Sequence, residues 1–323
     1  MDKMDKFDTK ILQNLLNDSR ISNSKLGKKI RLSRENVSYR IKKLTETQII
    51  KEFVAGINYT KLGWTQSVVF VQYKKITTET EKELIQFLKK QNCISWIGIL
   101  TGKWSLTFDV YHNSNEKLNQ TIKNILSRHK ELIGEYLVLE KIDSEFYFEK
   151  IIDEKNIFLT ELDKKKNETD KIDKIILKEL NKNPRISYVE LAKKTTLTPN
   201  GAKQRYKRLV NEQIIINNSI SVNHKILGYE WQGIQIKIKD HQKNIEKKLK
   251  EYFRHSRKII FFYQYNKSGI YDFDIGVIVK TSSELREFIN KLRTDFYSDV
   301  EIIDTFLVLD EASSHKLPNC IFN

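Results

Sequence analysis

The sequence is poor in the residues that build turns and cross-links. Its 323 residues include three prolines, 11 glycines and two cysteines, while 39% are hydrophobic and 11% are aromatic. So few turn residues argue against a turn-rich all-β sandwich and against long disordered stretches. Cys93 and Cys320 are far apart in the sequence and form neither a disulfide framework nor a CxxC metal pair. The apolar content suffices for packed cores, and the length suits two to four domains.

Long apolar segments are also lacking. No run approaches the roughly 20 residues that a membrane span requires, and residues 1–6 lack the apolar core of a signal peptide. We therefore expect a cytoplasmic protein without a membrane partner. Positive charge is in excess, with 57 Lys and Arg against 42 Asp and Glu and a formal net charge of +15. This balance favours a polyanionic partner but does not by itself separate DNA from RNA or an acidic membrane.

The second half of the chain repeats the first. Residues 8–12 align with residues 173–177, and the same offset continues without a gap to Leu62-Gly63 over Leu227-Gly228. Beyond that point the identities thin and the offset shifts slightly, so that Gly102 corresponds to Gly269. A repeat of this length predicts an a-b-a-b chain of two alternating domain types.

The first domain type has three helical stretches, and the third displays polar side chains. Ser33 is a good N-cap for that helix, and Thr198 followed by Pro199 occupies the same place in the second copy. On a helical wheel the apolar face packs inward, comprising Val37, Ile41 and Leu44 in one copy and Ala202, Tyr206 and Leu209 in the other. Two short helices, a tight turn and a polar third helix predict a helix-turn-helix with its reading helix.

Amide side chains can pair with adenine in the major groove, and Arg or Lys can reach guanine or phosphate. We predict that double-stranded DNA contacts the cap and outer face of each third helix: Ser33, Arg34, Glu35, Asn36, Ser38, Tyr39, Lys42 and Lys43, and Thr198, Asn200, Lys203, Gln204, Lys207 and Arg208. The distribution of charge agrees with DNA binding at these helices. Residues 20–51 hold ten Lys or Arg and two Asp or Glu, and residues 185–216 hold seven Lys or Arg and two Asp or Glu. These windows supply 13 of the 15 net charges.

The second domain type predicts a β-α-β-β-α-β order. In the first copy, residues 67–73, 94–100, 106–111 and 136–139 have strand patterns, whereas residues 79–91 and 115–129 are helical. The second copy repeats this order through residues 232–309. This is the ferredoxin-like arrangement, one antiparallel sheet with two helices on one face. The other face holds apolar side chains, so we expect it to pack against the sheet of the other copy.

The combination resembles the Lrp/AsnC (feast/famine) family of transcriptional regulators. The resemblance covers nearly the whole chain, twice. In the first half it rests on short matches: Asp8, Ile11-Leu12, Arg20-Ile21-Ser22, Leu26, Leu32-Ser33, Arg40 to Leu44, Ile49-Ile50 and Leu62-Gly63. The turn at Gly269-Ile270-Tyr271-Asp272 is similar to the family's Gly-x-Tyr-Asp turn. Two family turn glycines are replaced, one by Arg31 and Thr196 and the other by Gln48 and Gln213.

The resemblance implies an α+β chain of two winged-type helix-turn-helix domains alternating with two ferredoxin-like (RAM) domains. The expected ranges are 1–60, 64–150, a linker at 151–170, 171–225 and 229–312. It further implies that Arg40 and Arg205 sit near the DNA backbone. An amino acid or similar effector would bind between the sensor domains, at Thr101, Gly102, Trp104, Gly269, Tyr271 and Asp272. The two halves of the chain would form an intramolecular pseudo-dimer. Whether this pseudo-dimer assembles into further homo-oligomers is left open by the sequence.

Other functions leave weaker marks in the sequence. An enzymatic branch, the sirohaem decarboxylases, resembles this architecture. The six histidines of this chain, however, are scattered and do not repeat between the copies, and we expect His112 and His255 on the surface. We therefore expect that the protein is not an enzyme and that it has no catalytic residue, metal or cofactor. An architectural protein that coats DNA with little sequence preference fits the charge equally well. RNA binding is less favoured, because no paired aromatics resemble an RNP motif.

Overall fold

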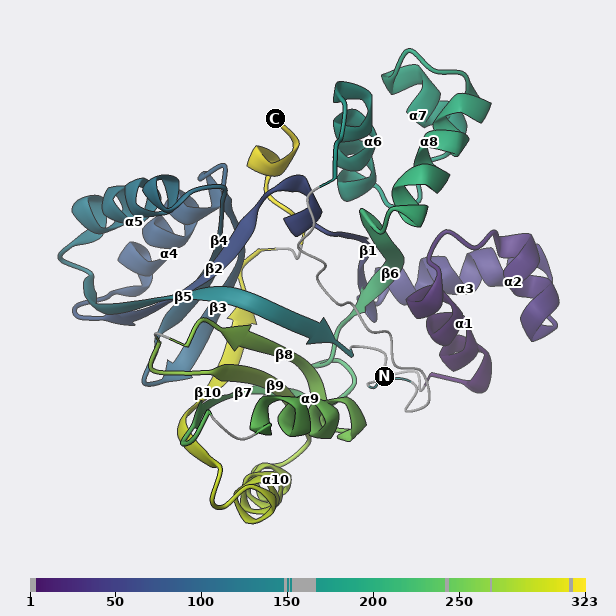
Figure 1. Cartoon of the computed structure of the whole chain (residues 1–323). Helices are drawn as coiled ribbons and strands as arrows, with labels where there is room; N and C mark the ends of the chain where they lie inside the picture. The colour runs from purple at the N-terminus through teal and green to yellow at the C-terminus, as the bar shows by residue number, and fades with distance from the viewer. Residues whose placement is uncertain are drawn as a thin grey trace.

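The computed structural model describes residues 4–147, 150, 152, 167–241, 244–267, 269–313 and 316–323. Two helix-turn-helix units lie on one side of the molecule, and an eight-stranded barrel with helices on its outside lies on the other (Figure 1). Most of the predicted linker at 151–170 falls outside the described residues. No helix among the described residues is long and apolar enough to span a membrane.

The three helices of each helix-turn-helix unit start at N-capping residues, as the sequence predicts for the third helix. The helices are α1 Lys6–Asn17, α2 Asn23–Ile30 and α3 Arg34–Glu46 in the first unit, and α6 Lys171–Lys182, α7 Tyr188–Lys194 and α8 Pro199–Asn211 in the second. Ser33 and Thr198 cap α3 and α8 through their side-chain oxygens. The caps fix where the reading helices start.

The two units share one wing instead of each having its own. Strand β1 (Ile50–Ile57) follows the first unit and pairs antiparallel with β6 (Ile215–Val222), which follows the second. We call this two-stranded sheet the ribbon. Ile220 of β6 lies in the core of the first unit, and Ile57 of β1 lies in the core of the second. A lone strand leaves its backbone N–H and C=O groups unpaired, and pairing across the repeat satisfies them.

Two arginines at equivalent places in the repeat fasten the units to each other. Arg20 donates to the carbonyl oxygens of Pro184 at 2.5 Å and Ile186 at 2.8 Å. Its guanidinium carbon also lies 5.0 Å from the ring centroid of Tyr206. Arg185 reaches back to Asn23 Oδ1 at 3.2 Å. The distance between the two reading helices is therefore set by contacts within this chain.

Each half of the barrel has the ferredoxin-like strand order that the sequence predicts. The first half contains β2 Thr65–Tyr73, α4 Thr78–Lys89, β3 Ile94–Gly102, β4 Leu106–His112, α5 Asn115–His129 and β5 Ile133–Phe146. The second contains β7 Glu230–Ile238, α9 Ile245–His255, β8 Ile259–Tyr265, β9 Phe273–Val279, α10 Ser282–Asp295 and β10 Val300–Glu311. The strand orders are β3-β4-β2-β5 and β8-β9-β7-β10.

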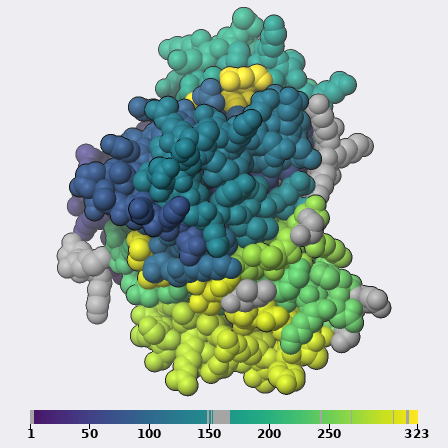
Figure 2. Space-filling view, turned by 90° about the vertical axis from the view of Figure 1, so that its left-hand side faces the viewer, coloured from purple at the N-terminus to yellow at the C-terminus, as the bar shows by residue number. Residues whose placement is uncertain are grey.

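The halves join edge to edge, which the predicted packing of two separate sheets did not include. β5 pairs with β8 and β10 pairs with β3, so the eight strands close into one barrel. β5 spans 14 residues, far beyond the predicted strand at 136–139, and this length lets it pair with strands of both halves. Figure 2 shows the two halves stacked, the first (blue to teal) above the second (green to yellow). The apolar inner faces fill the barrel with aromatic side chains, as the sequence predicts for a buried second face.

The end of the chain returns to the second helix-turn-helix unit. The short helix η3 (Asn319–Phe322) lies against α6, and Asn181 exchanges two hydrogen bonds with the backbone of Leu317, at 2.9 and 3.0 Å. Cys93 and Cys320, distant in sequence, meet here as free thiols. A hydrogen bond from Cys320 lowers the pKa of Cys93. The fold thus brings together two cysteines that sequence spacing kept apart.

Three of the four residues that replace the family's turn glycines keep a glycine-like backbone, and Thr196 does not. Arg31, Gln48 and Gln213 have φ angles of 63°, 58° and 56°. Gln213 follows α8, where Ile214 N–H bonds to Leu209 C=O at 2.9 Å in a Schellman arrangement. This left-handed conformation costs a non-glycine residue about 1 kcal/mol.

We expect Gln213→Gly to raise the free energy of unfolding by about 0.5 kcal/mol, because relief of the left-handed strain outweighs the added freedom of the unfolded chain. Urea unfolding of the variant and the parent chain measures this difference. Gln213→Ala, which keeps a Cβ at the same φ, is the matched control and should give no gain. A loss of stability in the glycine variant would contradict the assigned strain.

Candidate nucleic-acid interface and ligand cavity

The outer face of α3 is open to solvent, as the helical wheel predicts. Tyr39 is 66% exposed. The other exposed residues of this face are Arg34, Glu35, Asn36, Ser38, Lys42 and Lys43, with Ser33 exposed at the cap. Val37, Ile41 and Leu44 are buried on the opposite face. Side chains that hydrogen-bond bases and side chains that reach phosphates therefore stand on one accessible surface.

The outer face of α8 differs from prediction at two positions. Thr198, Asn200, Lys203, Gln204 and Lys207 are exposed. Tyr206, expected in the core, is only half buried, and its hydroxyl accepts a hydrogen bond from Asn218 Nδ2 at 2.7 Å. Arg208, expected to point outward, instead forms an ion pair with Asp173 of α6. A wheel drawn from one helix cannot show a partner that another helix supplies.

Arg40 is held by the start of α1. Its Nη1 lies 2.8 Å from Asp5 Oδ2 and 2.7 Å from Asp8 Oδ1, and its Nε donates to Asn36 at 2.9 Å. The backbone N–H of Asp8 and the Arg40 guanidinium together hold the pKa of Asp5 below its usual value. The ion pairs join the first helix of the unit to its reading helix. The predicted contact of Arg40 with the DNA backbone stays a prediction.

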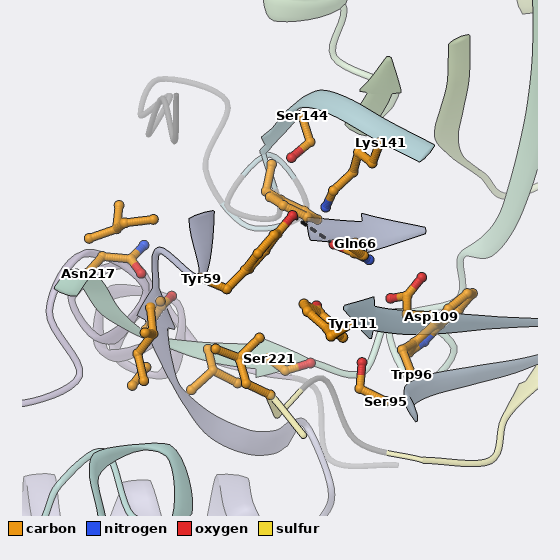
Figure 3. A pocket seen from close by; sticks show the side chains of 18 of the residues that line it. Tyr59, Gln66, Ser95, Trp96, Asp109, Tyr111, Lys141, Ser144, Asn217 and Ser221 are labelled. Atoms are coloured by element: carbon orange, nitrogen blue, oxygen red, sulfur yellow. Dashed lines mark hydrogen bonds between the residues drawn. The ribbon is translucent and has the colours of Figure 1, made fainter. Parts of the chain in front are cut away.

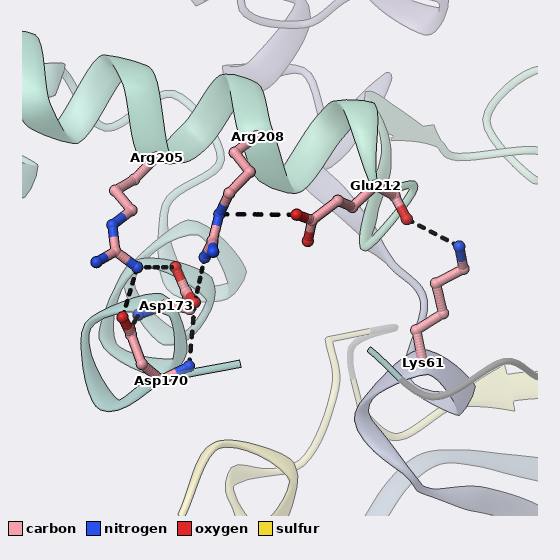
Figure 4. A network of polar contacts seen from close by, with 6 residues as sticks. All are labelled: Lys61, Asp170, Asp173, Arg205, Arg208 and Glu212. Carbon is pink, nitrogen blue, oxygen red and sulfur yellow. Dashed lines mark hydrogen bonds and ion pairs between the residues drawn. The ribbon is translucent and has the colours of Figure 1, made fainter. Parts of the chain in front are cut away.

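The second unit repeats this arrangement and extends it (Figure 4). Arg205 Nη1 lies 2.5 Å from Asp170 Oδ2 and 3.1 Å from Asp173 Oδ1. The Asp173 side chain is only 1% exposed and also pairs with Arg208. A buried carboxylate needs such partners, because removing it from water is costly otherwise. Arg205 and Arg208 therefore orient α8 on α6, and the DNA contact of these two arginines stays a prediction.

The six residues expected to bind an effector lie at the β3–β4 turn and just before β9, and three of their side chains are buried. Trp104 and Tyr271 are both buried in the barrel core, and Tyr271 Oη donates to Asp304. Gly102 lies beside Phe306 in the β10–β3 pairing, with Thr101 next to it. Asp272 Oδ2 accepts a hydrogen bond from the backbone of Ile238 at 2.7 Å. An effector at these residues stays a prediction.

A different place is hollow. A cavity of about 220 Å³ lies between the ribbon and the barrel, and we call it the ribbon cavity. The ribbon contributes Val54, Ala55, Gly56, Ile57, Ile216, Asn217, Ser219, Ile220 and Ser221; the barrel contributes Gln66, Ser95, Trp96, Asp109, Tyr111, Lys141, Ser144, Phe146 and Tyr263; and Leu16, Tyr59 and Leu317 complete the wall. None of these residues was predicted as a site from the sequence.

Lys141 brings a charge into this cavity (Figure 3). It is 7% exposed, and its Nζ lies 4.5, 5.3 and 5.8 Å from the ring centroids of Tyr263, Tyr59 and Phe146. Burial lowers the pKa of Lys141 to about 8, although the charges of Asp109 and Asp143 act in the other direction. Aromatic faces stabilise a cation, but less than a carboxylate would.

Comparison with known proteins agrees with this architecture. An AsnC-type helix-turn-helix domain matches residues 4–45, and a winged helix-turn-helix DNA-binding domain matches residues 169–216. An uncharacterized HTH-type transcriptional regulator of Pyrococcus furiosus is 30% identical over 132 residues, which are 41% of this chain and 84% of that protein. The chain belongs to the Lrp/AsnC family. Another member, the regulator LrpC of Bacillus subtilis, is 37% identical over 87 residues, or 27% of this chain and 60% of LrpC.

A solved structure matches both halves of this Lrp/AsnC chain at once. The siroheme decarboxylase NirDL covers 98% of this chain and 96% of its own, with a TM-score of 0.65 and 14% sequence identity. At that identity the likeness concerns the fold. Of the two histidines expected on the surface, His255 is exposed, but His112 is buried and its Nε2 lies 2.9 Å from Ser67 Oγ. His112 is the last residue of β4 and pairs with Thr65 of β2 in the sheet.

The sequence held one usable sign of Lys141. Alternate residues of a strand share a face, and Leu137, Leu139 and Lys141 therefore lie in one row of β5. A lysine in a row of otherwise apolar side chains departs from that pattern, and departures of this kind concentrate at functional sites. Nothing in the sequence showed that the ribbon would close over this row.

We expect Arg205→Ala to lower the free energy of unfolding by about 2 kcal/mol, because Asp173 then stays buried with one partner fewer. Thermal unfolding and hydrogen exchange in α6–α8 measure the loss. Lys203→Ala, an exposed cation two residues earlier, is the control and should change stability by less than about 0.5 kcal/mol. Equal stability of both variants would contradict the assigned role of Arg205.

We expect Lys141→Met to stabilise the protein at neutral pH by on the order of 2 kcal/mol, because an apolar side chain of similar length replaces a buried charge. With a folded pKa of about 8, against an ordinary value of 10.5, the folded chain releases this proton before the unfolded chain does. Parent stability should therefore rise between pH 8 and 10.5 through this residue. Urea unfolding across that window should show the rise reduced in Lys141→Met.

Proposed function

We propose that this regulator binds double-stranded DNA sequence-specifically by placing α3 and α8 in successive major grooves. The observation that carries the proposal is the pair of exposed polar faces, one on each reading helix, in two units fastened by the ribbon. Lysines on both faces can anchor phosphates, whereas Asn200 and Gln204 can read adenine. Groove docking of this kind requires that the helices keep a fixed separation, which the contacts of Arg20 and Arg185 support.

The two reading helices are unlike, so we propose an operator with two unlike half-sites. Glu35 and Tyr39 occupy on α3 the places that Asn200 and Gln204 occupy on α8. A homodimer would read a palindrome, because its two helices are identical. The pseudo-dimer formed by the halves of this chain has no such requirement.

We also propose a regulatory rather than catalytic role. The two relatives named above are transcriptional regulators. The ribbon cavity has neither histidine nor arginine among its described lining residues, the side chains that would hold the carboxylates of a tetrapyrrole. An architectural protein that coats DNA would differ from the proposed regulator only in its lack of sequence specificity. Selection of binding sites from random DNA therefore distinguishes the two.

Selection of bound duplexes from random DNA at moderate salt should enrich one motif of two different half-sites, about 10 base pairs or a multiple apart. Gln204→Ala should relax base choice within one half-site, because it removes a hydrogen bond to a base edge. Lys203→Ala should weaken binding to all sequences alike, because it removes a phosphate contact, and it is the matched control. Salt-sensitive binding without enrichment would instead support an architectural protein, and purely palindromic motifs would contradict unlike half-sites.

A further inference from the structure

The ribbon cavity contains a charge that the fold does not require. β5 and β10 are equivalent strands of the two halves, and each has an irregularity in its pairing, after Lys141 and after Val308. These irregularities place Val308 at the position of Lys141. Val308 is buried in the barrel core, as an inward residue of this strand should be. The same strand position therefore works with an apolar side chain, and Lys141 needs another explanation.

Lys141 and Ser144 are suited to receive an anion, on a wall that also includes the Asp109 carboxylate. Ser144 lies three residues further along β5 and lines the same cavity. Its side chain is fully buried, and its hydroxyl has no hydrogen-bond partner among the described residues. Figure 3 shows the Lys141 nitrogen and the Ser144 hydroxyl both directed into the cavity. A buried ammonium with a buried hydroxyl beside it can bind the two oxygens of a carboxylate.

The rest of the cavity wall is mostly apolar or aromatic. Val54 and Ile220 come from the ribbon and Leu317 from the C-terminal segment. The rings of Tyr59 and Tyr111 pack edge to face with centroids 5.0 Å apart. The volume of about 220 Å³ exceeds the ~150 Å³ that accommodates benzene in an engineered apolar cavity. A ring or branched alkyl group with one carboxylate is therefore of suitable size.

We propose that the ribbon cavity binds a small carboxylate with an apolar body, its carboxylate on Lys141 and Ser144 and its body between the ribbon and the barrel. One ligand binds per chain, because Val308 takes the place of Lys141 in the other half. The ligand contacts β1 and β6, whose residues also pack into the cores of both helix-turn-helix units. Control of DNA binding by the ligand rests on the proposed function, but binding to the cavity does not.

Isothermal titration of the full chain without DNA tests the proposal with three matched probes: 3-phenylpropionate, phenylalanine and 3-phenylpropanol. We expect the carboxylate to bind with one site per chain and the alcohol, which lacks the charge, to bind at least tenfold more weakly. Phenylalanine distinguishes a simple carboxylate from an amino acid, whose ammonium would lie toward Asp109. The proposal is supported if 3-phenylpropionate or phenylalanine binds to the parent chain and this binding is lost in Lys141→Met.

Lys141→Met should weaken carboxylate binding at least tenfold, and Ser144→Ala by a smaller factor. Lys258→Met is the control: Lys258 pairs with Glu284 at 2.8 Å and does not line the cavity, so binding should not change. Because Lys141→Met is expected to be more stable than the parent, lost binding would not reflect unfolding. Equal binding of acid and alcohol, full binding by Lys141→Met, or no binding of any probe at millimolar concentration would overturn the proposal. The selection experiment on DNA stands apart from each of these results.

Discussion

The structure depends on burying the apolar face that each of its two small sheets presents opposite its helices. Each ferredoxin-like half covers one face of its sheet with helices and leaves aromatic side chains on the other. Burying a side chain such as Phe70 or Phe306 contributes roughly 2–3 kcal/mol relative to leaving it in water. Closure of the barrel buries the uncovered face of both sheets at once. It also pairs the free edge strands β5 with β8 and β10 with β3. Exposed edges would otherwise invite pairing with other chains.

The barrel in turn determines where the DNA-binding units can lie. β2 and β7 begin shortly after the ribbon strands end, so the ribbon must leave the barrel close to the start of both strands. The hydrophobic cores of the two units reach across the ribbon, since β6 contributes to one and β1 to the other. A shift of the ribbon against the barrel would therefore move both units together. A cavity at that junction is placed where small changes in packing act on the whole molecule.

Local features of the fold were predictable from the sequence, and contacts between distant segments were not. Ser33 and Thr198 were recognisable as caps because capping depends on a side chain and a backbone N–H three residues later. The strand order within each half followed from periodicity. The β1–β6 pairing and the Arg208–Asp173 pair were missed, because each joins segments whose patterns are complete without the other. Lys141 was missed for the same reason, since its setting arises only when the ribbon covers β5.

Both seams of the barrel lie within one polypeptide. An ordinary dimer dissociates as it is diluted, so its occupancy of a two-part site falls with the square of the protomer concentration when subunits are scarce. In this chain the partner half is always present, at an effective concentration set by the covalent connection. Occupancy then follows the first power of concentration. A cell could keep such a regulator at very few copies without losing the geometry on which recognition of two grooves depends.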